Sequence, residues 1–247
     1  MGRDTALDDG EAGSGVTTFL VTGASRGVGR WLVRHLHEDG HQVIGACRSP
    51  DSAHALSAIG APVVRLDVTD DASIAALPAA VRSHTDTIDV LVNNAGIKRV
   101  DGRTWEASAG PLGALDRDAL IAVLDTNVVG ALMVTQGMAS MLRRPGGVVV
   151  NVSSQLGSLA GGVDLDYAYN CSKAALNMAT VSMQRDLGAS GITVVSLNPG
   201  WMRTDMAGDE APLEVSSTTR EIADLLTTLD ERSAGSFVDR FGHTVPW

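Results

Sequence analysis

The 247-residue sequence predicts an α/β protein with a doubly wound parallel sheet and helices on both faces. From Thr17 onward, short runs rich in β-branched residues alternate with longer amphipathic segments. The short runs are almost continuously apolar, as strands are when helices cover both faces of a sheet. Hydrophobic residues make up 44% and charged residues 19%, which is typical of globular proteins, and the length suits one domain, 16–247, better than two.

Each predicted element follows from these runs. The candidate strands are 18–21, 42–46, 63–67, 90–93, 147–152, 193–197 and, as the weakest, 236–238. The candidate helices are 29–38, 52–59, 72–83, 117–143, 168–187 and 214–229. The least regular segments, 97–115 and 201–212, follow the fourth and sixth strands, where an open parallel sheet binds its ligands.

Charge and composition exclude several classes of protein. With 29 acidic against 19 basic residues the net charge is -10, so nucleic acid is not an expected partner. The acidic segment 1–15 lacks the basic start and apolar stretch of a secretory signal, and we expect it to be disordered. The two cysteines, Cys47 and Cys171, suggest a reduced, cytoplasmic protein. No apolar stretch reaches membrane-spanning length, and the six histidines have no metal-ligand spacing.

A glycine-rich turn follows the first candidate strand. The segment Thr22-Gly-Ala-Ser-Arg-Gly-Val-Gly29 leads directly into a helical pattern. Without side chains at the glycines, a pyrophosphate can approach the helix N-terminus, whose free amides favour an anion. The alternative is a plain strand-to-helix turn. The candidate phosphate contacts are Gly23, Ser25, Arg26, Gly27, Val28 and Gly29.

The end of the second strand distinguishes between two dinucleotides. It reads Cys47-Arg48-Ser49, without the acidic residue that usually holds the ribose 2'-hydroxyl of NAD. Arg48, with Arg26 as a second cation, instead suits a 2'-phosphate, because guanidinium groups bind phosphate well. The sequence therefore favours NADP(H) over NAD(H). The alternative is that both arginines are solvated surface residues.

Two residue types are rare in this chain. It contains two tyrosines, Tyr167 and Tyr169, and two lysines, Lys98 and Lys173, while the other seventeen basic residues are arginine. Tyr169 and Lys173 are four residues apart in a helical pattern, which places them one turn apart on the same face. The residue four after Tyr167 is Cys171, so the spacing selects Tyr169 and Lys173.

Together these motifs resemble the short-chain dehydrogenase/reductase family. Besides the glycine turn and Tyr169-x-x-x-Lys173, the matching positions are Asp67, Asn93-Asn-Ala-Gly96, Asn127, Ser153-Ser154 and Pro199-Gly200. The ending resembles a narrower branch, the C-factor-like carbonyl reductases, through Asn198-Pro-Gly-Trp-Met-Arg-Thr-Asp-Met206 and Gly242-His-Thr-Val-Pro-Trp247.

The resemblance implies a Rossmann-type sheet of seven strands and a role for each matched position. The implied cofactor contacts, from the adenine end to the nicotinamide end, are Asp67, Val68, Asn94, Ala95, Gly96, Pro199, Gly200, Met202 and Thr204. Lys173 would bind the nicotinamide ribose, Ser154 would hold the substrate carbonyl oxygen, and Asn127 would hold a water that links Lys173 to solvent. The long helices are dimer-forming in relatives, so we expect a homodimer or homotetramer.

Reduction of a carbonyl group needs a proton donor at its oxygen. A tyrosine with a pKa of about 10 holds its proton too tightly to cycle readily at neutral pH, and a nearby ammonium group lowers that pKa. We therefore expect Tyr169 to act as general acid/base with its pKa lowered by Lys173. Taken singly, the motifs could be an exposed Tyr/Lys pair, a Ser-Ser strand end and a buried asparagine, but their conjunction favours catalysis.

The sequence thus predicts an NADPH-dependent oxidoreductase acting on a ketone or aldehyde, or a secondary alcohol, of a small and largely apolar substrate, without a metal. Trp105, Trp201 and Met206 in the irregular loops suggest the apolar pocket. Two alternatives stay open. One is a nucleotide-binding signalling or regulatory protein of the same fold, and the other is a specialised natural-product tailoring enzyme.

Overall fold

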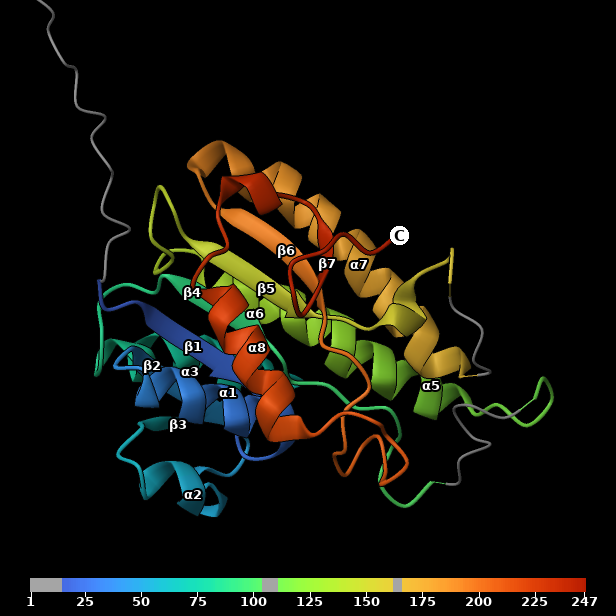
Figure 1. Cartoon of the computed structure of the whole chain (residues 1–247). Coiled ribbons are helices and arrows are strands. Elements are labelled where there is room, and N and C mark those ends of the chain that lie inside the picture. Colours follow the sequence, from blue (N-terminus) through green and yellow to red (C-terminus); the bar gives the residue numbers. More distant parts are fainter. Residues whose placement is uncertain (1–14, 104–110, 162–165) are drawn as a thin grey trace, which may run out of the picture.

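Seven parallel strands form one sheet in the order β3-β2-β1-β4-β5-β6-β7 (Figure 1). The computed structural model describes residues 15–103, 111–161 and 166–247, so the acidic segment 1–15 lies outside the described residues except for Gly15. The strands are β1 Thr18–Thr22, β2 Gln42–Cys47, β3 Val63–Arg65, β4 Val90–Asn93, β5 Val148–Val152, β6 Thr193–Asn198 and β7 Phe237–Asp239. The predicted doubly wound sheet is confirmed.

Helices cover both faces of this sheet. They are α1 Gly27–Glu38, α2 His54–Ser57, α3 Asp71–Arg82, α5 Arg117–Leu124, α6 Gly130–Met138, α7 Tyr167–Leu187 and α8 Val215–Leu226. Figure 1 shows α1 and α8 side by side over one face, where they contact each other. Strand side chains alternate between two buried cores: Phe19 and Val21 pack on the α1–α8 side, and Leu20 packs on the side of α3, α6 and α7.

The predicted helix over 117–143 is five residues too long at its end, and it is not α-helical throughout. A π-helical turn, Asp125–Val129, separates α5 from α6, and α6 ends at Met138. The chain then pairs with the segment before β4, because Ile88 N donates to Met141 O at 2.8 Å and Arg143 N donates to Ile88 O at 2.8 Å. A π turn holds one extra backbone residue and often occurs at functional sites. Asn127 lies in this turn.

The helical stretch from α5 to α6 also tests the prediction that no segment could span a membrane. Arg117–Met138 contains an 18-residue window with a mean hydropathy of 1.5 and is long and apolar enough to cross a membrane, contrary to our expectation from the sequence. Core helices of soluble proteins meet the same criterion, so one such stretch is weak evidence. Here α5 contacts α7, and α6 contacts α3.

Buried polar side chains tie the middle strands to the helices. Asn93 Nδ2 donates to Thr135 Oγ1 and to Asn151 Oδ1, both at 2.9 Å, and Asn151 Nδ2 donates to Thr180 Oγ1 at 2.9 Å. All four residues are buried. Because unpaired buried polar groups are costly, these bonds hold β4 and β5 in register with α6 and α7.

Candidate active site

A cavity of about 820 Å³ lies beyond the carboxyl ends of the strands. This volume is within the range of sites for small molecules and cofactors. The cavity is lined by residues from the glycine turn, the ends of β2, β4, β5 and β6, and the first turns of α7. All the candidate site residues chosen from the sequence line it, apart from Gly29 and Asn127.

The glycine turn brings the start of α1 against the end of β4. Gly23 has a φ of 67°, and a Cβ there would lie 2.9 Å from Ala95 Cα. A Cβ at Gly29 would lie 2.5 Å from both Gly23 O and Asn94 Nδ2, which explains why Gly29 is a packing residue behind the cavity. Among the described residues, no side chain caps the N-terminus of α1, and its first turn has no acid. The turn therefore suits an anion.

The Asn94 side chain holds the glycine turn to the end of β4. Its Nδ2 donates to Thr22 O at 2.8 Å. In return, Thr22 Oγ1 accepts hydrogen bonds from Asn94 N and Ala95 N, both at 3.0 Å. These bonds join the ends of β1 and β4, so the segment that lines the cavity beside the glycine turn is held by hydrogen bonds between side chains and backbone.

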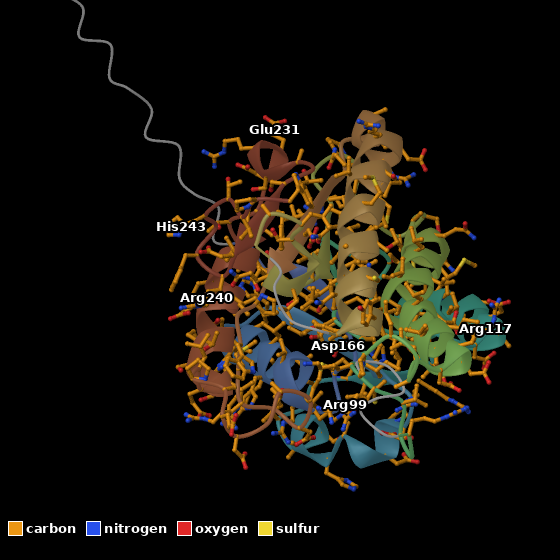
Figure 2. All side chains as sticks on the ribbon, turned by 90° about the vertical axis from the view of Figure 1, so that its right-hand side faces the viewer. Arg99, Arg117, Asp166, Glu231, Arg240 and His243 are labelled. Atoms are coloured by element: carbon orange, nitrogen blue, oxygen red, sulfur yellow. The ribbon has the colours of Figure 1, made fainter. Side chains whose placement is uncertain are left out.

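Tyr169 and Lys173 face the cavity from the first turns of α7. Asp166, labelled in Figure 2 at the start of this helix, caps it by accepting a hydrogen bond from Tyr169 N at 3.0 Å. Lys173 is 5% exposed, its Nζ donates to Val152 O at 2.8 Å, and it lies 5.4 Å from the centroid of the Tyr169 ring. The predicted pairing of Tyr169 and Lys173 on one helix face is thus observed.

Burial shifts the pKa values of both residues. Burial raises the pKa of Tyr169 to about 12, a hydrogen bond with the Ser154 side chain opposes the rise, and the Asp166 carboxylate adds to it. Burial also lowers the pKa of Lys173 to about 8. The net direction is opposite to the predicted lowering of the Tyr169 pKa, because loss of water around the phenol outweighs any stabilisation of its phenolate by Lys173. Tyr169 therefore keeps its proton at neutral pH.

The two adjacent serines have different environments. Ser154 lines the cavity and begins a short turn, Gln155–Gly157, in which its Oγ accepts a hydrogen bond from Leu156 N at 3.2 Å. Ser153 also borders the cavity, but it is only 1% exposed and its Oγ donates to Asn177 Oδ1 at 2.6 Å. Ser154 is therefore the serine that can meet a ligand, as the family pattern implies.

Gly157 is a residue that the sequence analysis missed. A Cβ at this position would lie 2.7 Å from the carbonyl carbon of Lys173 and 2.8 Å from its Cβ. The missing side chain allows the turn after Ser154 to lie directly on α7, which brings Ser154 and Tyr169 together. The only sequence signal was a glycine three residues after Ser154.

Asn127 lies behind the cavity. Its Oδ1 accepts a hydrogen bond from Ile97 N at 2.8 Å, and its Nδ2 donates to Ile97 O at 2.8 Å and to Ser172 Oγ at 2.9 Å. The side chain thus ties the segment after β4 to α7. Because both Nδ2 protons are used, the implied water relay would need the Asn127 backbone or the second lone pair of Oδ1.

Lys98 is a second residue that the sequence analysis missed. Its Nζ lies 5.8 Å from the centroid of the Tyr169 ring and 3.6 Å from Asp166 Oδ2. Lys98 follows β4, far from Tyr169 in the chain, so helical spacing could not find it. The only signal was the rarity of lysine.

The other end of the cavity is solvent-exposed. Arg48 is exposed, and Arg26 NH1 lies 3.5 Å from Asp205 Oδ2, with side chains that are 64% and 79% exposed. Both arginines are oriented so that they line the cavity. In the described part of the chain, no three His, Cys, Asp or Glu side chains gather as a metal site would require.

Comparison with known proteins identifies the family. The short chain dehydrogenase family model matches residues 17–214. C-signal from Myxococcus xanthus is 40% identical over 166 residues, which cover 66% of this chain and 95% of that protein.

Two solved structures have the same fold. Carbonyl reductase Sniffer of D. melanogaster has a TM-score of 0.85 and 31% sequence identity, covering 94% of this chain and all of that one. NADPH-bound carbonyl reductase from chicken fatty liver has a TM-score of 0.84 and 30% identity, covering 94% and 99%. The chain therefore belongs to the short-chain dehydrogenase/reductase family of oxidoreductases.

Proposed function

We propose that this chain is an NADPH-dependent oxidoreductase that converts a ketone or aldehyde to an alcohol, or the reverse, on a small and largely apolar substrate. The observation that carries the proposal is that the Ser154 hydroxyl, the Tyr169 phenol and the Lys173 ammonium group meet in the cavity that begins at the glycine turn. The NADPH-bound carbonyl reductase with the same fold supports the choice of reaction and cofactor.

The residues present fit a dinucleotide phosphate. The uncapped start of α1 and the glycines at 23 and 27 leave room and amide donors for the pyrophosphate. Arg48 and Arg26 would hold the 2'-phosphate, and Asp67 and Val68 would line the adenine site. The nicotinamide end would be lined by Asn94, Ala95, Gly96, Pro199, Gly200, Met202 and Thr204. When bound, the cofactor supplies or accepts the hydride.

The protein residues handle the proton. In reduction, Tyr169 gives its proton to the substrate oxygen, and in alcohol oxidation the tyrosinate takes one back. A pKa of about 12 keeps Tyr169 protonated at neutral pH, which suits reduction. Ser154 donates a hydrogen bond to the same substrate oxygen and orients it. Lys173 stabilises the phenolate through its nearby charge, and it would also hold the nicotinamide ribose.

The cavity wall and the surface suggest the substrate and the assembly. Ile97, Leu156, Trp201 and Met206 line the same cavity as Tyr169 and support a small apolar substrate, while Trp105 lies outside the described residues. Ile121, Val129, Leu132 and Met178 are exposed apolar side chains on α5, α6, the π turn between them and α7, and they support a homodimer or homotetramer. We also retain a cytoplasmic location as part of the proposal.

The direct test is to mix the purified chain with NADPH or NADH and a panel of apolar ketones and aldehydes. We expect cofactor oxidation with at least one carbonyl compound, faster with NADPH than with NADH. A protein that binds NADPH but reduces no compound would instead support a regulatory nucleotide-binding role, which the similarity to C-signal favours. Turnover confined to one elaborate substrate would point to a tailoring enzyme.

A further inference from the structure

The only two lysines of this chain face the same aromatic ring. Lys173 reaches the Tyr169 ring from within α7, and Lys98 reaches it from the segment after β4, with Nζ-to-centroid distances of 5.4 and 5.8 Å. Both distances are within the range over which an ammonium group interacts with an aromatic ring. Tyr169 therefore has two compact cations beside it, although the other seventeen basic residues are arginines.

Lys98 is held in place from two sides. Its Nζ is 3.6 Å from Asp166 Oδ2, and the Asp166 side chain is only 2% exposed. The preceding residue, Ile97, is bonded to the Asn127 side chain through both its N–H and its carbonyl. With its side chain 24% exposed and lining the cavity, Lys98 is partly desolvated, so its charge acts over a short distance with little screening.

The Asp166 carboxylate is the negative charge that Lys98 can offset. Its carboxylate caps α7 by accepting a hydrogen bond from the backbone N–H of Tyr169, so a negative charge lies close to the phenol. Among the described residues, the charged groups that face Tyr169 are Lys173 on its own helix, Asp166 at the start of that helix, and Lys98 from the β4 side. The Ser154 hydroxyl faces it from the end of β5. An uncompensated carboxylate would oppose formation of the phenolate.

We propose that Lys98 is a positioning residue of the active site: paired with Asp166, it offsets the negative charge of that carboxylate and stabilises the phenolate formed when Tyr169 releases its proton. The inference rests on the proposed role of Tyr169 as general acid/base. It assigns Lys98 an effect through Tyr169 and requires no contact between Lys98 and the substrate.

The test measures the ionisation of Tyr169 directly. Tyr167→Phe leaves Tyr169 as the only tyrosine of the chain, so phenolate absorbance then reports this residue alone. Biosynthetic incorporation of a fluorinated tyrosine at this single position lowers the pKa of the phenol by several units, so that its ionisation midpoint lies below the ordinary lysine pKa of about 10.4 and Lys98 still carries its charge there. In this background, Lys98→Met should raise the ionisation midpoint by about 1 pH unit or more, and Asp166→Asn should lower it by about 1 pH unit. Asparagine caps helices as well as aspartate does, so α7 keeps its start.

Two further variants separate charge from structure. Arg99→Met removes a cation from the exposed neighbouring residue, labelled in Figure 2, and should leave the midpoint unchanged. The double variant Lys98→Met/Asp166→Asn should return close to the parent, because it removes both charges. If Tyr169 in the Lys98→Met variant is still protonated at the pH of the parental midpoint, the result supports the proposal.

The proposal is overturned if Lys98→Met behaves like Arg99→Met, or if Lys98→Met and Asp166→Asn shift the midpoint in the same direction, as loss of a purely structural contact would. If Lys98→Met does not fold, the proposal is still overturned when Asp166→Asn leaves the ionisation midpoint of Tyr169 unchanged or raises it. The titration uses neither cofactor nor substrate. Failure of the proposed function would therefore appear in the carbonyl panel and leave this measurement interpretable.

Discussion

The two ends of the cavity are built in opposite ways. At the proposed catalytic end, Lys173 is buried and bonded to Val152, and Ser154 lies on a turn that packs directly against α7. At the phosphate end, Arg48 is exposed, and Arg26 pairs with the exposed side chain of Asp205. The catalytic end is held by packing and buried hydrogen bonds, whereas the phosphate end depends on solvated charge.

This difference predicts different consequences of substitution. A buried, bonded group has few alternative positions, so its removal should affect the rate of the chemical step or the stability of the fold. Exposed cations gain little from a surface ion pair and are screened by salt, so their removal should affect cofactor affinity alone.

Apart from Tyr169, the largest effect is expected at Ser154. Ser154→Ala removes a hydrogen-bond donor to the substrate oxygen and should lower kcat by about 100-fold or more. The matched control is the adjacent Ser153→Ala, which removes a buried bond to Asn177 and should cost about 1 kcal/mol of stability with kcat retained. Steady-state kinetics and chemical denaturation of both variants measure this. Equal loss of kcat in the two variants would contradict the assignment of Ser154 as the hydrogen-bond donor to the substrate oxygen.

Lys173 should make the stability of the ligand-free protein depend on pH. Its pKa is about 8 in the folded chain and 10.5 in its ordinary state, so between these values the unfolded chain binds more protons and stability rises with pH. From pH 8 to 10, the free energy of unfolding should increase by up to about 3 kcal/mol more in the wild type than in Lys173→Met. Denaturant titrations across this range measure the difference, and parallel curves would rule out the depressed pKa.

Gly157→Ala tests the close approach that brings Ser154 to Tyr169. The added methyl group would meet the Lys173 backbone, so either the turn or α7 must shift. We expect a loss of about 1–3 kcal/mol in stability and a fall in kcat of about 10-fold. Gly161→Ala is the control and should change neither quantity, because this glycine on the cavity wall is exposed and the nearest described atom to an added Cβ is Ser158 Oγ, at the ordinary contact distance of 3.9 Å. Unchanged kcat in Gly157→Ala would show that the turn tolerates displacement.

The smallest effect is expected at the phosphate end. Arg48→Ala should weaken NADPH binding by about 10-fold while leaving NADH binding unchanged, since a guanidinium–phosphate contact is lost. Arg26→Ala should have less effect, because Arg26 must first leave Asp205. Fluorescence titrations at low and high salt measure this, and the difference between variants should shrink as salt rises. If Arg48→Ala weakened NADH binding as much as NADPH binding, a role of Arg48 at the 2'-phosphate would be excluded.

The sequence was most informative where burial is continuous. The near-unbroken apolar runs of β1, β4 and β5 predicted strands covered by helices on both faces, and these strands are buried throughout. The π turn between α5 and α6 escaped notice because such a turn has no residue signature, and Asp125–Val129 reads like ordinary helix. Helical spacing identified Tyr169 and Lys173 because both lie on α7.

Residues brought together by the tertiary fold could not be predicted. Lys98 reaches Tyr169 only because β4 lies beside β5 and the Asn127 side chain holds Ile97. Gly157 matters only because its turn packs on the Lys173 backbone. The direction of the pKa shift of Tyr169 was missed for the same reason, since it depends on how deeply the phenol is buried.

The most direct test of the central claim compares the two tyrosines of the chain. NADPH oxidation by a carbonyl substrate is measured with Tyr169→Phe and Tyr167→Phe, and NADPH binding is measured with both. The account predicts that Tyr169→Phe binds NADPH yet loses turnover, since no other group provides the proton, while Tyr167→Phe retains it. Turnover by Tyr169→Phe at a rate near that of the wild type would contradict the assignment of Tyr169 as the proton donor.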